Sequence, residues 1–238
     1  MDAVFKTAQE ARGPVPPPPP VAAGAKGRLF ETGIRLFSLY GYEGTTTRMV
    51  AAEAGVNIST ISYYFGGKEE FYRAVLQHTA EIIERSYNDI YPATRARLDS
   101  GQMTRQEALD AIILLISRAI HVYIERPYLR TFPLIRWENF HHPGGDTPIA
   151  EVLIRVKDIL LTDLLGVYRP ELTQENREVL SRLINGSIMS YADTPLLARR
   201  PDSTDQEAFD AWRKKHKKHV FHFLRYSIEH YLPDNAAD

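Results

Sequence analysis

The sequence predicts an all-α protein, and three observations carry that prediction. Apolar residues recur at three- and four-residue spacings through most of the chain, as on one side of a helix. Glycines and prolines fall between these periodic segments, where helices must end. No run alternates apolar and polar residues in the manner of a strand. With 238 residues, the chain can hold a buried core in one large domain or in a small and a medium one.

Composition narrows the class of protein. The chain has no cysteine, which excludes disulfides, thiolate metal ligands and a cysteine nucleophile. No apolar run approaches the roughly 18 residues that span a bilayer, and the first residues lack the apolar core of a signal peptide. The net charge of −1 argues against a protein that coats nucleic acid non-specifically. We therefore expect a cytoplasmic protein that has no membrane partner.

The first 24 residues differ from the rest of the chain. Their prolines, at position 14 and from 16 to 20, fix the backbone and remove hydrogen-bond donors. We expect residues 1–24 to be a disordered, solvated extension. The alternative is a ligand for a binding module of the SH3 or WW type.

Two helices and a turn follow this extension. Residues 26–40 have an apolar side and stop at Gly41, a typical C-cap. The threonines at 45–47 offer an N-cap for a short helix over residues 48–54. Gly55 can adopt the positive φ that a sharp turn between crossing helices requires.

A third helix follows the turn. Asn57 or Ser59 can cap it, and Gly66 with Gly67 closes it. Its apolar side has Ile58, Ile61 and Phe65, and its polar side has Thr60, Ser62, Tyr63 and Tyr64. Two helices joined in this way form a helix-turn-helix, which reads DNA by laying its second helix in the major groove.

The remaining helices are longer. The fourth begins at Lys68 and is expected to stop near Tyr91 and Pro92, since proline ends a helix. Thr104 with Glu107 has the spacing of a capping box. The later helices are expected over Thr104–Glu125, Tyr128–Phe140, Pro148–Val167, Thr173–Ala192 and Asp205–Leu232.

About a fifth of the chain resembles a known family. The residues that carry the resemblance are Thr46-Thr47-Arg48, Ala51, Ala54-Gly55-Val56, Tyr64-Phe65 and Lys68. They match the N-terminal signature of TetR-type transcriptional repressors at that family's intervals. Within the family, Asn57-Ile58 followed by Ile61 to Gly66 is most similar to the CecR (YbiH) subgroup.

The resemblance implies a domain organisation. Residues 25–72 would form the helix-turn-helix DNA-binding domain, residues 73–232 a helical domain that binds a small-molecule effector and dimerises, and residues 233–238 a tail. A homodimer would then bind a double-stranded DNA operator. The helices over 173–192 and 205–232 have apolar stripes that suit a four-helix dimer interface, or packing within the monomer.

The resemblance also assigns DNA-contacting residues. Arg48 is long enough to reach a guanine edge or a phosphate. Many relatives have tyrosine in place of Ser62 and a basic or polar residue in place of Ile58, which could touch a thymine methyl group or belong to the core. Of Tyr63 and Tyr64, only one is expected to face outward, and the family pattern favours Tyr64. The set is Thr46, Thr47, Arg48, Asn57, Ile58, Ser59, Thr60, Ser62, Tyr63, Tyr64 and Lys68; simple surface capping is the alternative for its serines and threonines.

An effector pocket needs apolar walls with a few polar anchors. Aromatic and polar residues of the later helices provide such a set, although ordinary core packing would use them equally well. The candidates are His121, Tyr123, Arg126, Phe132, Arg136, Trp137, Phe140, Met189 and Tyr191.

Two further kinds of function have weaker support. His216, His219 and His222 could hold a metal, but three-residue steps drift around a helix, so we expect a solvated face and no metal or other cofactor. No catalytic constellation is present, so the chain is not expected to be an enzyme. The function predicted is a ligand-responsive DNA-binding repressor. The alternative is a helical interaction protein whose helix-turn-helix is vestigial.

Overall fold

The computed structural model describes residues 24–121, 134, 147–193 and 205–231. The all-α prediction is confirmed, because every regular element in these ranges is helical. The helices form two compact units. We call α2, α3, α4, α5 and α9 the N-terminal unit, and α6, α7, η2, α10, α11 and α12 the C-terminal unit. No helix in the described ranges is both long enough and apolar enough to cross a membrane.

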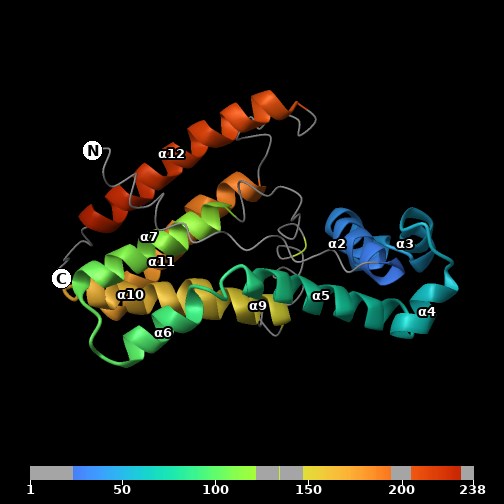
Figure 1. The fold of residues 1–238 in the computed structure, drawn as a ribbon, viewed down its shortest axis with the longest axis horizontal. Coiled ribbons are helices and arrows are strands. Elements are labelled where there is room, and N and C mark those ends of the chain that lie inside the picture. The colour runs from blue at the N-terminus through green and yellow to red at the C-terminus, as the bar shows by residue number, and fades with distance from the viewer. Residues whose placement is uncertain (1–23, 122–133, 135–146, 194–204, 232–238) are drawn as a thin grey trace, which may run out of the picture. The chain divides into compact units, whose positions relative to one another are not determined.

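The N-terminal unit contains the predicted three-helix head and the long helix after it (Figure 1). Helix α5 packs against α2, α4 and α9. Helix α3 contacts both α2 and α4. The bounds are α2 Ala25–Gly44, α3 Thr47–Glu53, α4 Ser59–Phe65, α5 Lys68–Arg85 and α9 Pro148–Leu153.

The backbones of α2 and α5 approach closely at Gly33. A Cβ atom at this position would lie 2.7 Å from Phe71 Cζ and 2.7 Å from Val75 Cγ2. Both of those side chains are completely buried in α5, so neither can move aside. Glycine at this position therefore sets the distance at which the head packs on α5.

We expect Gly33→Ala to lower the free energy of unfolding by about 1–3 kcal/mol, because it overpacks a filled core. Urea denaturation followed by helical circular dichroism measures this loss. Glu31→Ala, on the exposed side of the same helix, is the control and should change stability by less than about 0.5 kcal/mol. Equal stabilities for the two variants would contradict the close approach.

Helix α2 runs slightly further than predicted, to Gly44, but Gly41 interrupts it with a φ of 68°. The hydroxyl of Thr45 is fully buried and lies 2.8 Å from the Gly41 carbonyl oxygen, to which it donates. This contact satisfies a carbonyl that the interruption leaves without a helical partner. The prediction that the regular helix stops at Gly41 is therefore correct, because the helical backbone breaks there.

The C-terminal unit is built around α7, α10 and α11. Helix α12 lies alongside α7 and α11, at the top of Figure 1. Helix α7 packs against α10 and α12, and α11 packs against α10, η2 and α12. The predicted capping box is confirmed, with Glu107 N donating to Thr104 Oγ1 at 3.2 Å and Thr104 N donating to Glu107 Oε2 at 2.7 Å. The bounds are α6 Tyr91–Asp99, α7 Arg105–Ile120, η2 Ile154–Ile159, α10 Leu160–Tyr168, α11 Gln174–Asp193 and α12 Gln206–His230.

Two predictions about helix bounds were wrong. Helix α5 ends at Arg85, and Tyr91 and Pro92 begin α6 instead of ending α5. Proline fits the first turn of a helix, where its missing N–H is not needed. The span predicted as one helix, 148–167, contains the π-helix η2 in its middle. Both α11 and α12 agree with their predicted spans to within about two residues.

Candidate nucleic-acid interface and ligand pocket

The turn between α3 and α4 is fixed by short-range hydrogen bonds. Thr46 caps α3 by accepting a hydrogen bond at 3.2 Å from Met49 N. Gly55 has a φ of 62°, as predicted for the turn. Asn57 Oδ1 then accepts hydrogen bonds from Ser59 N at 2.9 Å and from the Ser59 hydroxyl at 2.8 Å. These contacts place α4 directly after the turn and leave the hydroxyl of Ser59 at the surface.

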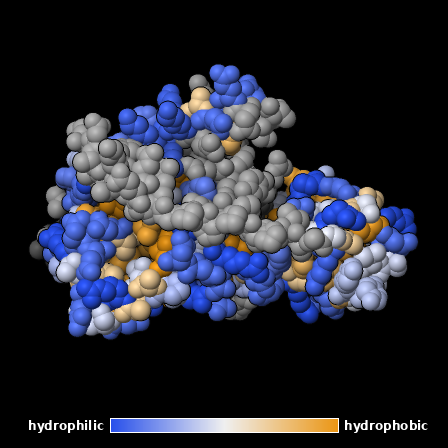
Figure 2. Space-filling view, viewed as in Figure 1, coloured by the Kyte–Doolittle hydropathy of each residue, from blue (hydrophilic) through white to orange (hydrophobic). Residues whose placement is uncertain are grey.

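Helix α4 is anchored by two residues, Ile61 and Phe65. Ile61 is buried, and the Phe65 ring lies 5.5 Å from Phe30 and 4.9 Å from Phe71. The opposite side of α4 is exposed. Figure 2 shows a pale surface over α4, the colour of residues near neutral hydropathy, where charged residues would be deep blue.

The exposed surface of α4 corrects one sequence prediction. Tyr63 and Tyr64 both face outward, with 83% and 46% of their surfaces exposed. Neither is needed inside, because Phe65 fills the interior position next to them. Ile58 is 45% exposed and so is not a core residue, which leaves its apolar side chain accessible at the start of α4. Ser62 is exposed as well, and Thr60 is half-buried.

Three of the six cations between residues 25 and 73 are already engaged. Arg73 pairs with Glu69, Arg35 pairs with Glu53, and Arg28 Nε donates to the Ala54 carbonyl at 2.9 Å. Arg48, exposed on α3, makes no hydrogen bond or ion pair with the described residues. The charge that this head can offer to an anion is therefore concentrated at few positions, and Arg48 is one of them.

Lys68 is another such cation. It begins α5, directly after the glycines that close α4, and its Nζ lies 4.2 Å from the centroid of the Tyr42 ring. That ring is itself packed against Tyr72, 5.0 Å away. The aromatic face holds the lysine stem in place through a cation–π contact but leaves the ammonium without a carboxylate partner in the described residues. Arg48 and Lys68 thus belong to the helices before and after α4.

A histidine supports α4 from inside the N-terminal unit. The ring of His78, on α5, stacks on Phe30 at 4.3 Å, and Phe30 contacts Phe65 at the end of α4. Burial lowers the pKa of His78 below its ordinary value, Arg85 and Lys26 lower it further, and Glu81 opposes them. The neutral ring is therefore the form that the folded head favours.

This pKa shift predicts a pH dependence for the N-terminal unit. Since the folded pKa is lower than the unfolded one, the stability that His78 contributes is present above the unfolded value of about 6.5. It is lost as the pH falls through the lower folded pKa. We expect the thermal midpoint of the parent to fall between pH 7.5 and 5.5 more steeply than that of His78→Phe, which keeps the stack but cannot titrate. Parallel pH profiles for the two proteins would contradict this role.

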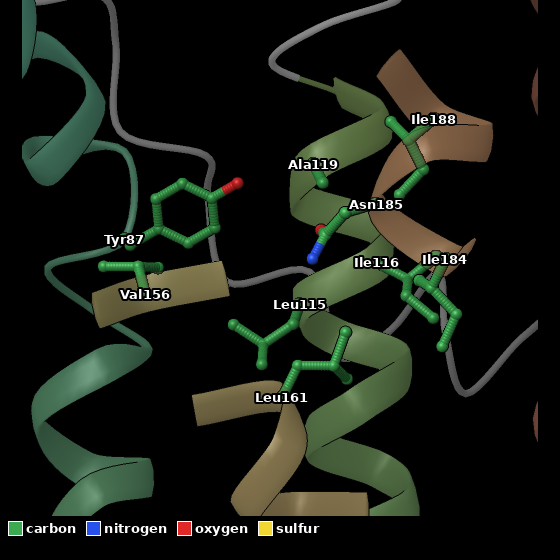
Figure 3. A pocket seen from close by; sticks show the side chains of 9 residues that line it. All are labelled: Tyr87, Leu115, Ile116, Ala119, Val156, Leu161, Ile184, Asn185 and Ile188. Carbon is green, nitrogen blue, oxygen red and sulfur yellow. The ribbon is translucent and has the colours of Figure 1, made fainter. Parts of the chain in front are cut away.

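The C-terminal unit contains a small pocket with room for about one water molecule (Figure 3). Tyr87, directly after the C-cap of α5, lines one side of it. The other walls are mostly aliphatic and come from α7, η2, α10 and α11. The lining residues are Tyr87, Asn185, Leu115, Ile116, Ala119, Val156, Leu161, Ile184 and Ile188.

Comparisons with known proteins decide the family. Residues 29–75, which span the head and the start of α5, match the model of the bacterial regulatory proteins of the tetR family. A stretch of 168 residues, 70% of this chain, is 43% identical to 75% of the HTH-type transcriptional dual regulator CecR of Shigella flexneri. The chain belongs to the TetR family. The resemblance that the sequence predicted is confirmed.

Solved structures share the TetR fold. FadR of Bacillus halodurans, described as a fatty acid degradation regulator, matches with a TM-score of 0.55 at 16% identity, over 87% of this chain and 98% of that one. FadR of Bacillus subtilis, solved in complex with stearoyl-CoA, matches with a TM-score of 0.52 at 20% identity, over 83% of this chain and 96% of that one. At such identities the likeness shows the fold alone.

The predicted effector residues are only partly within the described structure. His121 and Met189 are described, whereas the side chains of the other predicted residues lie outside the described part of this TetR-family chain. The pocket of Figure 3 is lined by residues outside the predicted set, and that set stays a prediction.

The histidines of α12 make no metal site with their described surroundings. His216 stacks on Trp212 at 4.6 Å, and burial lowers its pKa, helped by Lys215 and His219. Within the described ranges, no group of three or more histidine or acidic side chains is placed to hold a metal ion.

Proposed function

We propose that this TetR-family chain is a ligand-responsive repressor that binds a palindromic operator as a homodimer and is released by a small-molecule effector. The observation that carries the proposal is the exposed side of α4, with Arg48 before it and Lys68 after it, neither of which pairs with a carboxylate in the described residues. Phosphate contacts position such a helix, and contacts with base edges supply specificity. Residues 25–72 form the DNA-binding domain in this proposal, and residues 73–232 the effector-binding and dimerisation domain.

The head needs a second copy because its charge is small. From residue 25 to residue 73 there are six cations and five anions, and six minus five leaves +1. Phosphate affinity grows with the number of phosphates neutralised, so one head binds weakly. Two heads held at a fixed spacing bind successive major grooves about one helical turn apart.

Exposed apolar side chains on α11 and α12 support the dimer. Leu183 on α11, and Phe223 and Tyr226 on α12, each expose more than half of their surfaces. Gly186 lies one turn after Leu183, and a Cβ added to it would meet no atom of the described residues within 4 Å, so a second helix can approach there. Exposed apolar side chains of this kind are typical of obligate interfaces.

We expect Leu183→Glu and Phe223→Glu to convert the dimer to monomers, with at least a tenfold rise in the dissociation constant, because each would bury a charge without a partner. Sedimentation velocity over a concentration series measures this change. Arg182→Glu, exposed beside Leu183, is the control for added negative charge. Variants that stay dimeric while folded would place the interface elsewhere.

In this proposal, the effector changes DNA binding by moving α5. An effector can shift the equilibrium only by binding the released conformation more tightly than the DNA-bound one. Tyr87 lines the pocket and directly follows α5, which begins at Lys68. We therefore expect an effector bound in the C-terminal unit to change the position of α5 and, with it, that of Lys68.

Selection of genomic DNA fragments by the purified protein tests the proposed function. We expect enrichment of near-palindromic sites with half-sites about 10 base pairs apart or a multiple of that spacing. The selection is repeated with a library of small molecules, and release from the selected site identifies the effector. Failure to enrich any sequence with a folded, dimeric protein would overturn the repressor function in favour of the interaction protein.

A further inference from the structure

Three large apolar or aromatic side chains are exposed at α4. Ile58, Tyr63 and Tyr64 expose 45%, 83% and 46% of their surfaces. A single exposed apolar residue is normal on a protein surface, whereas a group of them on one element is typical of a surface that binds a partner. Ile58 is the aliphatic member of this group, and its side chain has no hydrogen-bonding atom. Its contribution to a DNA-binding surface is therefore an apolar contact.

The backbone at Ile58 is fixed by its neighbours. Asn57 Oδ1 accepts hydrogen bonds from Ser59 N at 2.9 Å and from the Ser59 hydroxyl at 2.8 Å, which closes an Asx turn around Ile58. Ile58 itself has helical backbone angles, with a φ of −56° and a ψ of −33°. A β-branched side chain on a fixed backbone has few rotamers. Ile58 is therefore ordered before a partner arrives, so that a contact with it costs little entropy.

The same hydrogen bonds occupy the polar groups on either side of Ile58. An asparagine that reads adenine uses its amide oxygen and nitrogen together, and the oxygen of Asn57 already accepts two hydrogen bonds. The Ser59 hydroxyl donates its proton to that oxygen. Hydrogen-bond readout of a base by Asn57 or Ser59 would have to break these contacts first, whereas an apolar contact by Ile58 leaves them in place.

DNA offers a side chain such as Ile58 one kind of partner. Among the groups that base edges present in the major groove, the C5-methyl group of thymine is apolar, and the others are hydrogen-bond donors or acceptors. Isoleucine opposite thymine buries two apolar surfaces against each other. Opposite another base it would cover a donor or an acceptor without pairing it, which costs free energy. Ile58 therefore favours thymine by attraction and disfavours the other bases by desolvation.

We propose that Ile58 is a specificity-determining residue, which selects a thymine in each half-site of the operator by contact with its C5-methyl group. This inference rests on the proposed function, because it takes α4 as the helix that enters the major groove. Cations such as Lys68 position the head on phosphates, which carry no sequence information. Ile58 supplies part of the sequence preference that those contacts lack.

Replacement of thymine by deoxyuridine tests this contact, because it removes the C5-methyl group and leaves the hydrogen-bonding atoms of the base pair unchanged. The probe is the operator duplex selected by the full-length parent, with each thymine replaced in turn in both half-sites. We expect one position at which the replacement weakens binding by the parent about 15-fold, which is about fourfold for each methyl group. Ile58→Ala should bind the two duplexes with equal affinity to within about twofold. Fluorescence anisotropy measures each affinity.

Two further variants control for side effects of the substitution. Ile58→Val keeps a β-branched aliphatic side chain and should retain a preference for thymine over deoxyuridine. Leu39→Ala is the matched control, because it removes an aliphatic side chain that is 51% exposed on α2. This control should keep the full preference of the parent. Circular dichroism confirms that each variant is folded.

The outcomes separate this proposal from the proposed function. A selected operator in which no thymine methyl group affects binding, or a methyl preference that Ile58→Ala retains, would overturn the role of Ile58 and leave the repressor function standing. A folded parent that selects no sequence would overturn both. An operator that shows the Ile58-dependent preference but is released by no small molecule would support the role of Ile58 and overturn only the release by an effector.

Discussion

Replacing Arg48 with alanine is expected to weaken operator binding by about 30-fold or more. A specific contact with a base or phosphate is worth roughly 1–3 kcal/mol, and a dimer loses it in both half-sites. Arg48 is exposed and has no partner in the described residues, so its loss removes affinity without disturbing a contact in the fold. Fluorescence anisotropy with a labelled operator measures the change.

Lys68→Ala should weaken binding in a different way. A phosphate contact is insensitive to sequence, so affinity for operator and for unrelated DNA should fall together, and the salt slope should decrease by about 1 per subunit. Arg73→Ala is the matched control, because it removes the same charge from the same helix, but from a side chain already paired with Glu69. We expect the control to change affinity less than about threefold.

A folded, dimeric Arg48→Ala protein with parental affinity would exclude α3 from the DNA interface.

The parts of the head that the sequence predicted depend on short-range chemistry. The cap at Thr46, the positive φ of Gly55 and the Asn57 side chain each act on groups within a few residues. Residue type and spacing are enough to predict such contacts. The outward position of Tyr63 could not be predicted in this way, because it depends on Phe65 filling the interior against Phe30 and Phe71.

Helix α6 was missed because it lacks the signal by which helices are predicted. Its buried residue is Thr94, so it has no apolar stripe. Its side-chain contacts to the rest of the chain include the ion pairs of Arg95 with Asp163 and of Arg97 with Glu107, and the contact of the Tyr91 ring with Arg155. Partners so far along the chain cannot be assigned from periodicity. The π-helix was missed for a related reason, since the apolar spacing of residues 148–167 fits a regular helix equally well.

The largest stability loss is expected at Arg169, whose role also depends on distant residues. Its side chain is 7% exposed and lies at the end of α10, where it pairs with Glu171. Its guanidinium donates to the carbonyl oxygens of Ile228 at 2.8 Å, Glu229 at 3.3 Å and Tyr231 at 2.9 Å. Ile228 and Glu229 lie in the last turn of α12 and Tyr231 is its C-cap, where carbonyl oxygens lack a partner within the helix. Arg169 therefore caps α12 from a position about 60 residues earlier in the sequence.

Arg169→Met keeps the length of the side chain and removes every donor, so it should lower the free energy of unfolding by about 2–4 kcal/mol. Hydrogen exchange should show lost protection in the last two turns of α12 before any change in α7. Arg182→Met, which removes an exposed arginine paired with Glu178, should cost less than about 0.5 kcal/mol. Because α12 is half of the proposed dimer interface, Arg169→Met should also weaken dimerisation and, through it, operator binding. The size of the loss in operator affinity would measure how far DNA binding depends on the packing of α12. An unchanged free energy of unfolding would show that this cap does not stabilise the fold.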